Sequence, residues 1–198
     1  ISITVASAEG PASAGIASRT ITTAGNKRAG YLLFNAHIRG AQDKLIAILG
    51  GMANQGLDTV VLDLRYNGGG FVYTALSLAT MLSSPAADNK VFEKLQFNDK
   101  RVQETADSAF VFTSALQFSE GGFPSGFALP RLALPRVYVL STENTCSASE
   151  SVINGLRGVD VEVVLVGTAT CGKPYGFSRQ DNCGLAYYPI EFQGTNAK

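Results

Sequence analysis

Two segments of the sequence carry side chains that could together break an acyl bond. In Thr145-Cys-Ser-Ala-Ser-Glu150, Ser147 lies between a predicted strand and a predicted helix. In Thr170-Cys-Gly-Lys-Pro-Tyr175, Lys173 follows the next predicted strand. A serine hydroxyl becomes a nucleophile when a neighbouring base takes its proton, and an uncharged lysine amine can be that base. A Ser147–Lys173 pair is therefore one interpretation of these segments.

In such a pair, the lysine needs a lowered pKa. The reference pKa of a lysine is about 10.4, and a base that works near neutrality needs a value of roughly 7–8. Burial shifts the pKa in that direction, and Pro174, Tyr175 and Phe177 could form an apolar shield. The structural alternatives are a solvated loop lysine and, for Ser147-x-x-Glu150, a helix capping box.

Other catalytic chemistries have less support. His37 is the only histidine, and its apolar surroundings in the sequence favour a packed core residue over a catalytic base. One His and three scattered Cys do not make a ligand set, so we expect no metal and no cofactor. Asn67-Gly-Gly-Gly70 lacks the spacing of nucleotide-binding loops. It is either a tight turn or a run of backbone N–H groups that face an oxyanion.

The elements that must position these residues follow from apolar patterning. The chain has 198 residues, 45% hydrophobic and 16% charged, which indicates one domain with a large core. Strands alternate with helices, so we expect an α/β fold with a mostly parallel sheet. Sites in such sheets lie at the carboxyl ends of strands, where the loops 65–70, 141–147 and 167–174 would meet. The expected strands are 31–38, 59–64, 136–140, 161–166 and 185–192, and the expected helices are 41–55, 73–82 and 147–156.

The domain prediction has three parts. Residues 1–29 read as an extended lead-in arm that opens with a strand at Ile1, Ile3 and Val5, and residues 30–198 read as the core domain. Within the core, 86–130 is an irregular insertion. Its phenylalanines fit ordinary irregular packing or, as an alternative, a cap that faces a substrate.

Charge and cysteine content limit the partners. Sixteen Lys and Arg balance sixteen Asp and Glu without clustering, so we expect no nucleic-acid partner and no polybasic membrane patch. No apolar stretch reaches about 18 residues, so we expect no membrane-spanning segment. Three cysteines allow one disulfide. Cys171 and Cys183 flank a short polar loop that a disulfide could close, with Cys146 left as the thiol; whether they pair stays open, and a bond would need an oxidising compartment.

Four motifs in order resemble the C-terminal processing peptidases, also called tail-specific proteases, which are serine peptidases with a Ser-Lys dyad. The resemblance covers roughly residues 30–192, except the middle segment. The motifs are Gly30-Tyr-Leu-Leu-Phe-Asn35, Val61-Leu-Asp-Leu-Arg-Tyr-Asn-Gly-Gly-Gly70, Ser147-Ala-Ser-Glu150, and Gly167 followed by Thr170-x-Gly-Lys173.

The resemblance implies a fold and a mechanism. The fold is a crotonase/ClpP-like α/β core with a mostly parallel sheet flanked by helices. Ser147, rather than Ser149, is the nucleophile and Lys173 is the base, while the backbone N–H groups of Gly69 and Ala148 form the oxyanion hole. The implied activity is endopeptidase cleavage near the C-termini of polypeptide substrates through an acyl-enzyme, in a bacterial protein that is periplasmic or otherwise extracytoplasmic.

Two departures from the family pattern keep alternatives open. The family's glutamine four residues after the lysine is here Phe177, so the group that orients Lys173 is not identified. No PDZ domain is present in this sequence, and we expect it before Ile1 in the parent protein. The main alternative is an inactive peptide- or ligand-binding domain of the same fold. An acyl-CoA enzyme of the crotonase fold is a further alternative, although no CoA pocket is evident in the sequence.

Overall fold

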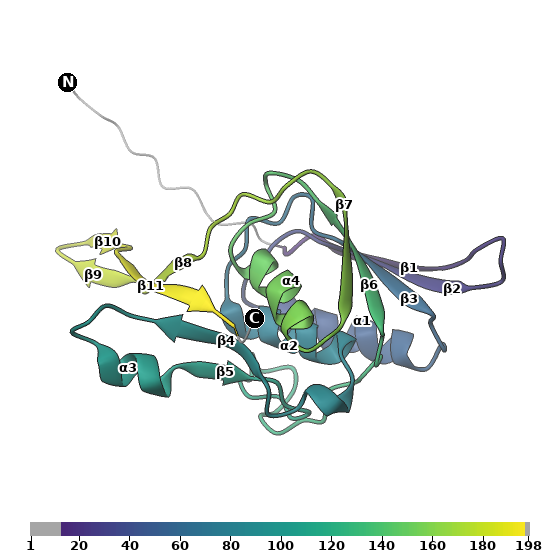
Figure 1. The fold of residues 1–198 in the computed structure, drawn as a ribbon, viewed down its shortest axis with the longest axis horizontal. Coiled ribbons are helices and arrows are strands. Elements are labelled where there is room, and N and C mark those ends of the chain that lie inside the picture. The colour runs from purple at the N-terminus through teal and green to yellow at the C-terminus, as the bar shows by residue number, and fades with distance from the viewer. Residues whose placement is uncertain (1–12, 197–198) are drawn as a thin grey trace.

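A five-stranded sheet forms the body of the computed structural model, which describes residues 13–196 (Figure 1). The strand order is β1-β2-β3-β6-β7. The last four strands are parallel, and β1 is antiparallel to β2 at one edge. This confirms the predicted α/β fold with a mostly parallel sheet. The strands are β1 (Ile16–Thr22), β2 (Arg28–Phe34), β3 (Thr59–Asp63), β6 (Arg136–Ser141) and β7 (Glu162–Gly167).

Three helices lie on one side of this sheet (Figure 1). They are α1 (Ala41–Ala53), α2 (Val72–Leu82) and α4 (Ala148–Gly158), all close to their predicted positions. Their apolar faces and the inward side chains of the strands form one buried cluster, with Leu32 and Phe34 from β2 among the fully buried residues. Burial of this apolar surface is the main stabilisation of the body.

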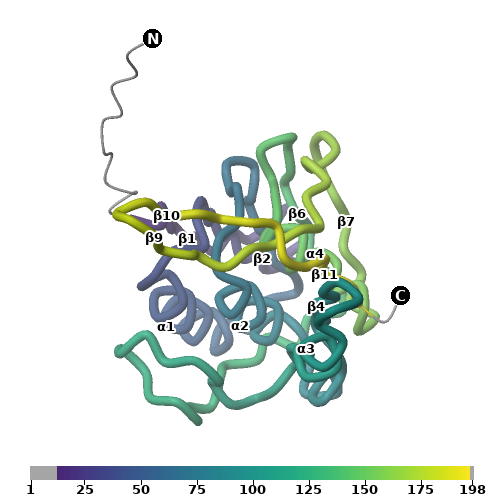
Figure 2. The backbone as a smooth tube through the Cα atoms, turned by 90° about the vertical axis from the view of Figure 1, so that its left-hand side faces the viewer, coloured from purple at the N-terminus to yellow at the C-terminus, as the bar shows by residue number. Residues whose placement is uncertain are grey.

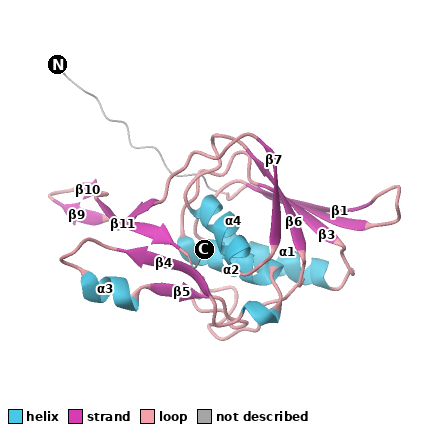
Figure 3. Cartoon of the chain, viewed as in Figure 1, coloured by secondary structure: helices cyan, strands magenta, loops and turns pink. Residues whose placement is uncertain are grey.

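A second, antiparallel sheet packs against α4, in the strand order β5-β4-β11-β8. Figure 2 shows the C-terminal segment in yellow, with β11 beside β4, and Figure 3 shows α4 between the two sheets. Its strands are β4 (Val91–Gln96), β5 (Ala109–Val111), β8 (Tyr175–Phe177) and β11 (Ile190–Thr195). The remaining elements are η1 (Pro85–Ala87), α3 (Val102–Asp107) and the hairpin β9 (Gln180–Asn182) with β10 (Leu185–Tyr187).

This sheet corrects two predictions. The segment 86–130 is not irregular throughout, since residues 91–111 supply β4, α3 and β5. The closing strand predicted over 185–192 is divided into β10 and β11, and Pro189, which has no N–H to donate to a ladder, lies between them. Short strands with long-range partners carry little local signal, which is why the sequence pattern did not show them.

The lead-in segment also differs from its prediction. Residues 16–22 form β1, which pairs along its whole length with β2, so this part of the predicted arm belongs to the sheet. The strand predicted at Ile1, Ile3 and Val5 lies outside the described residues. Within 13–196, no helix is long and apolar enough to cross a membrane.

Candidate active site

Two loops that follow neighbouring strands are joined by hydrogen bonds. The backbone carbonyl of Asn67 accepts from the Cys146 N–H at 3.1 Å and from the Ser149 hydroxyl at 3.0 Å. Gly69 then lies so close to the serine segment that a Cβ on it would stand 2.8 Å from the Ser147 Cβ, and its φ is +97°. Only glycine allows this approach in this conformation. The predicted meeting of loops 65–70 and 141–147 is confirmed.

Ser147 has an unusual backbone conformation. It is the N-cap of α4 with φ 56° and ψ −118°, a region that costs a non-glycine residue on the order of 1–3 kcal/mol. Such strain concentrates at active sites, where a sharp turn between strand and helix presents a nucleophile. Ser149, in contrast, is buried with its hydroxyl committed to the Asn67 carbonyl, so of the two serines Ser147 is the candidate nucleophile.

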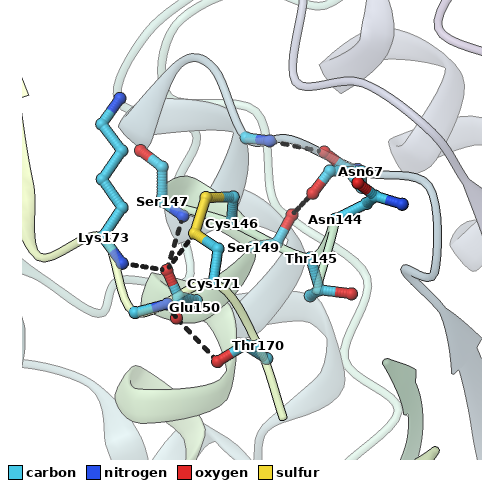
Figure 4. The surroundings of a disulfide bond; sticks show 12 residues. Asn67, Asn144, Thr145, Cys146, Ser147, Ser149, Glu150, Thr170, Cys171 and Lys173 are labelled. Carbon is cyan, nitrogen blue, oxygen red and sulfur yellow. Dashed lines mark hydrogen bonds between the residues drawn. A yellow bond between two sulfur atoms is a disulfide. The ribbon is translucent and has the colours of Figure 1, made fainter. Parts of the chain in front are cut away.

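One carboxylate ties the serine segment to the lysine segment (Figure 4). Oε2 of Glu150 accepts from the backbone N–H of Ser147 at 2.8 Å and from that of Lys173 at 2.9 Å. Its Oε1 accepts from the Thr170 hydroxyl at 2.7 Å and from the Gly172 N–H at 2.8 Å. The Glu150 carboxylate therefore fixes the two candidate catalytic residues relative to each other through their backbones.

These hydrogen bonds keep the Glu150 carboxylate charged. Burial raises the pKa of Glu150, but the hydrogen bonds from the Thr170 hydroxyl and from the backbone N–H groups of Lys173, Ser147 and Gly172 outweigh burial and lower the pKa overall. The part of the predicted capping box in which Glu150 accepts from the Ser147 N–H is thus present. The same side chain also accepts hydrogen bonds from the loop that holds Lys173.

A disulfide joins the same two segments. Cys146 pairs with Cys171, with their Cα atoms 5.3 Å apart, and Cys183 is a free, exposed cysteine. The predicted Cys171–Cys183 pair is therefore wrong. Proximity along the chain suggested that pair, whereas the parallel pairing of β6 with β7 brings the loops that hold Cys146 and Cys171 together.

The lysine side chain does not touch the serine hydroxyl in this structure. No hydrogen bond joins Lys173 Nζ to Ser147 Oγ within the described part of the chain; instead Nζ lies 4.6 Å from the centroid of the Phe177 ring. Figure 4 shows both side chains pointing to the same side from neighbouring segments. The predicted apolar shield is partial, because Tyr175 and Phe177 remain 47% and 43% exposed.

The two predicted oxyanion donors have different surroundings. The N–H of Ala148 is in the first turn of α4, where backbone donors have no partner within the helix. The N–H of Gly69 donates to Asn67 Oδ1 at 3.0 Å, so it is occupied in this conformation. The next residue, Gly70, lines the cleft beside Ser147 and Ala148.

Asn67 and His37 hold the glycine loop in place through hydrogen bonds, a role that the sequence did not reveal. Asn67 Nδ2 donates to the Phe34 carbonyl, so its Oδ1 is the acceptor for the Gly69 N–H and for His37 Nδ1 at 3.0 Å. The prediction of a core histidine is confirmed, because His37 is fully buried. Burial lowers the pKa of His37 to about 4, despite its hydrogen bonds to Asn67 and Gly69.

An ion pair between a buried carboxylate and a partly exposed arginine anchors the start of this loop. Asp63, at the end of β3, accepts from Arg65 Nε at 2.9 Å and Nη2 at 2.7 Å and from the Tyr31 hydroxyl at 2.6 Å. Burial raises the pKa of Asp63, but the hydrogen bonds from Arg65 and Tyr31 outweigh it and lower the pKa. Asp63 and Arg65 of the D-L-R motif therefore fix the chain at the point where the glycine loop begins.

The candidate residues open onto one cleft of about 1080 Å³. Ser147, Ala148, Gly70 and Lys173 line it on the side of the body. Its opposite wall comes from the second sheet and from the segment after Lys173, and it carries many aromatic side chains, among them Phe92, Phe110, Tyr175, Phe177 and Phe192. Polar side chains of α4 and of the second sheet, among them Glu93, Asn154 and Arg157, also line it. A cleft that combines an aromatic wall with polar groups is typical of a binding site.

The side chains of the described residues that could together bind a metal ion lie beside Ser147 and Lys173. Among residues 13–196, the one group of three ligand side chains within 4.8 Å of one another is Cys146, Glu150 and Cys171. Its two sulfur atoms are bonded to each other, so in the disulfide form they are not thiolate ligands.

Solved structures with the same fold include peptidases. A Bacteroides fragilis NCTC 9343 protein assigned as an S41 protease is similar with a TM-score of 0.75 and 30% identity, over 91% of this chain and 46% of that one. The photosystem II D1 C-terminal processing protease has a TM-score of 0.64 and 18% identity, over 91% of this chain and 43% of that one. A Streptococcus agalactiae lipoprotein has a TM-score of 0.59 and 14% identity, over 90% of this chain and 57% of that one.

This chain thus spans less than two thirds of the length of each of these proteins. No curated protein sequence matches it. The model of peptidase family S41 matches residues 28–181, which include the glycine loop, Ser147 and Lys173. On that match, the chain belongs to peptidase family S41.

Proposed function

We propose that this chain is the catalytic core of a serine endopeptidase in which Ser147 is the nucleophile and Lys173 the base. The observation that carries the proposal is the Glu150 carboxylate, which holds the backbones of both residues at the edge of one cleft. The strained backbone of Ser147 supports the same assignment, since its cost is otherwise unexplained.

The mechanism requires an uncharged Lys173 amine that leaves the Phe177 ring and turns to Ser147. The amine takes the proton of Oγ while Oγ attacks the substrate carbonyl. The N–H of Ala148 and one N–H of the pair Gly69–Gly70 stabilise the oxyanion. Lys173 then protonates the leaving amine, and water hydrolyses the acyl-enzyme by the reverse sequence.

Polypeptide is the proposed substrate class, and cleavage near C-termini is the proposed specificity. The family and the solved C-terminal processing protease of the same fold support both. An extracytoplasmic location is part of the proposal. The disulfide supports it, because such bonds persist in oxidising compartments. A PDZ domain in the parent protein remains an expectation.

A peptide-binding domain without catalysis is the second candidate. The position of Lys173 Nζ over the Phe177 ring, without a hydrogen bond to Ser147 Oγ, favours it. In that case the cleft would hold an extended peptide and leave it intact.

The replacement Ser147→Ala separates the two candidates. We expect the wild-type chain to cleave unfolded casein and Ser147→Ala to lose this cleavage while still binding casein. The matched control is Ser18→Ala, an exposed serine on β1, which should cleave like the wild type. Equal cleavage by Ser147→Ala would reject the dyad, and binding without cleavage by the wild type would establish the second candidate.

The specificity is tested with peptides. One peptide is supplied with a free C-terminal carboxylate and again as its amide, and the products are identified by mass spectrometry. We expect faster cleavage of the free carboxylate form, at a bond close to that end. Equal rates for both forms would remove the C-terminal part of the proposal.

A further inference from the structure

The disulfide occupies a special place in the chain. Cys146 directly precedes Ser147, and Cys171 lies two residues before Lys173, so one covalent bond spans the segments of the proposed nucleophile and base. The two cysteines are 25 residues apart in sequence, with α4 and β7 between them. Figure 4 shows the bond beside Glu150 and between the two segments.

Apart from the disulfide, hydrogen bonds attach the lysine segment to the rest of the chain. Residues 168–174 have no regular secondary structure. Three hydrogen bonds to Glu150 and one from the Cys171 N–H to the Thr145 carbonyl at 3.0 Å join them to the serine side of the site. At the start of the segment, the Thr168 N–H donates to the Ser141 carbonyl at 3.1 Å and the Ser141 hydroxyl donates to the Thr168 carbonyl at 2.9 Å. At its end, the Pro174 carbonyl accepts from the Gly194 N–H at 2.8 Å. The Gly172 bond is exposed and the Thr170 and Lys173 bonds are part-buried, and hydrogen bonds that water can reach open more easily than those of a buried core, because water replaces them at little net cost. The disulfide is therefore the one covalent restraint that keeps Lys173 near Ser147.

The bond is accessible from solvent. Cys171 is exposed and Cys146 is half-buried. Thiol–disulfide exchange begins with attack by a thiolate on a reachable sulfur, so the Cys171 sulfur is the expected point of attack.

We propose that the Cys146–Cys171 disulfide is a redox switch of the active site, which is competent when the bond is closed and impaired when it is open. This regulation rests on the proposed peptidase function. The reductant is a dithiol, either a small molecule or a protein of the same chemistry. A chain in a reducing compartment would then hold its protease activity low until it reaches an oxidising one.

The exchange balances as a two-electron reaction. One thiolate of the dithiol attacks Cys171 Sγ, the Cys146–Cys171 bond breaks, and Cys146 leaves as a thiolate that takes a proton. The second thiol of the reductant then displaces Cys171 as a thiol and closes the disulfide of the reductant. The protein gains two electrons and two protons, and the dithiol loses them.

The experiment uses a Cys183→Ser background, so that the pair is the sole redox-active cysteine chemistry in the chain. Casein cleavage is measured with the bond closed and again after dithiothreitol, and then after reoxidation with oxidised glutathione. EDTA is present throughout, because opened Cys146 and Cys171 with Glu150 form a group able to hold a metal ion. We expect reduction to lower kcat on the order of 10- to 100-fold, as for a small displacement of a catalytic group, and reoxidation to restore it.

Variants distinguish the bond from side effects of the reductant. The variant with Cys146→Ala and Cys171→Ala in the same background should have the low activity of the reduced chain and no response to dithiothreitol. Far-UV circular dichroism confirms that both forms are folded. Equal kcat for the closed form and for this variant would overturn the proposal.

A second readout is independent of activity. Amide hydrogen exchange at Gly172 and Lys173, whose N–H groups donate to Glu150, should accelerate at least about tenfold on reduction, while exchange in β3 and β6 stays unchanged. Unchanged exchange at both amides would refute the switch. If the closed form fails to cleave casein at all, the proposed function fails, and the exchange measurement still decides whether the bond restrains the segment.

Discussion

Glu150 receives four hydrogen bonds on its two carboxylate oxygens, two on each. A glutamine has one oxygen and an NH₂ group in place of the other, and this group would face N–H donors. We expect Glu150→Gln to lower the free energy of unfolding by about 1 kcal/mol, near the low end for an unsatisfied group because the site is half-buried. Casein cleavage should fall on the order of tenfold or more, because the segments of the proposed nucleophile and base lose their common acceptor.

The control for this substitution is Glu143→Gln, an exposed position on the turn that follows β6. Urea unfolding and the casein assay should give wild-type values for this control. A Glu150→Gln protein that matches it in both measurements would show that the carboxylate is dispensable.

Because of His37, we expect the free energy of unfolding to depend on pH. Its pKa is about 4 in the folded chain, below the ordinary value of 6.5, so between these values the unfolded chain binds more protons. The contribution of neutral, buried His37 to the free energy of unfolding is complete above pH 6.5 and is lost as the pH falls toward about 4. A shift of this size corresponds to about 3 kcal/mol.

The measurement is urea unfolding across that pH range for the wild type and for His37→Asn, which keeps a donor near the position of Nδ1. Other groups titrate in both proteins, so the difference between the two curves isolates His37. We expect the wild-type curve to fall more steeply with decreasing pH. Parallel curves would mean that the imidazole is not held neutral.

At the scale of elements, α4 approaches the second sheet at a glycine. A Cβ added to Gly155 would lie 2.3 Å from Phe92 Cδ2, and Phe92 is fully buried. We expect Gly155→Ala to destabilise the chain by about 1–3 kcal/mol through overpacking. Because α4 also carries Ser147 at its start, displacement of the helix should lower casein cleavage as well.

Gly51 in α1 is the matched control, because a Cβ there would have no neighbour within 4 Å. Alanine is the better helix former, so Gly51→Ala should stabilise the chain by about 0.5–1 kcal/mol. Denaturant unfolding of the two variants checks the opposite signs. A neutral or stabilising Gly155→Ala would contradict the close packing of α4 against β4.

At the scale of the whole molecule, the disulfide closes a loop that contains α4 and β7. A cross-link over about this length lowers the entropy of the unfolded chain and stabilises the fold by about 3 kcal/mol. In the Cys183→Ser background, guanidinium unfolding of the closed form and of the Cys146→Ala, Cys171→Ala variant should differ by about that amount. A difference near zero would show that the bond acts on the site alone.

The body of the fold and the candidate catalytic residues could be predicted from the sequence. Apolar runs at 59–64 and 136–140 are strands because a buried parallel strand needs both faces apolar, and this requirement is local. Ser147, Lys173 and the glycine loop were found because each follows a strand, and the ends of parallel strands meet at one edge, whereas Ala148 came from the family resemblance. Their catalytic roles remain proposals.

Other features depended on tertiary contacts. The Cys146–Cys171 pair, the support of Gly69 by Asn67 and His37, and the second sheet all join residues far apart in the chain, and neither periodicity nor spacing encodes which distant partner each will find. The position of Lys173 over Phe177 belongs to the same class, since a flexible side chain settles among whatever groups the assembled cleft offers. The residue types in this sequence determined which chemistry is available, and the packing of distant segments decided which groups meet.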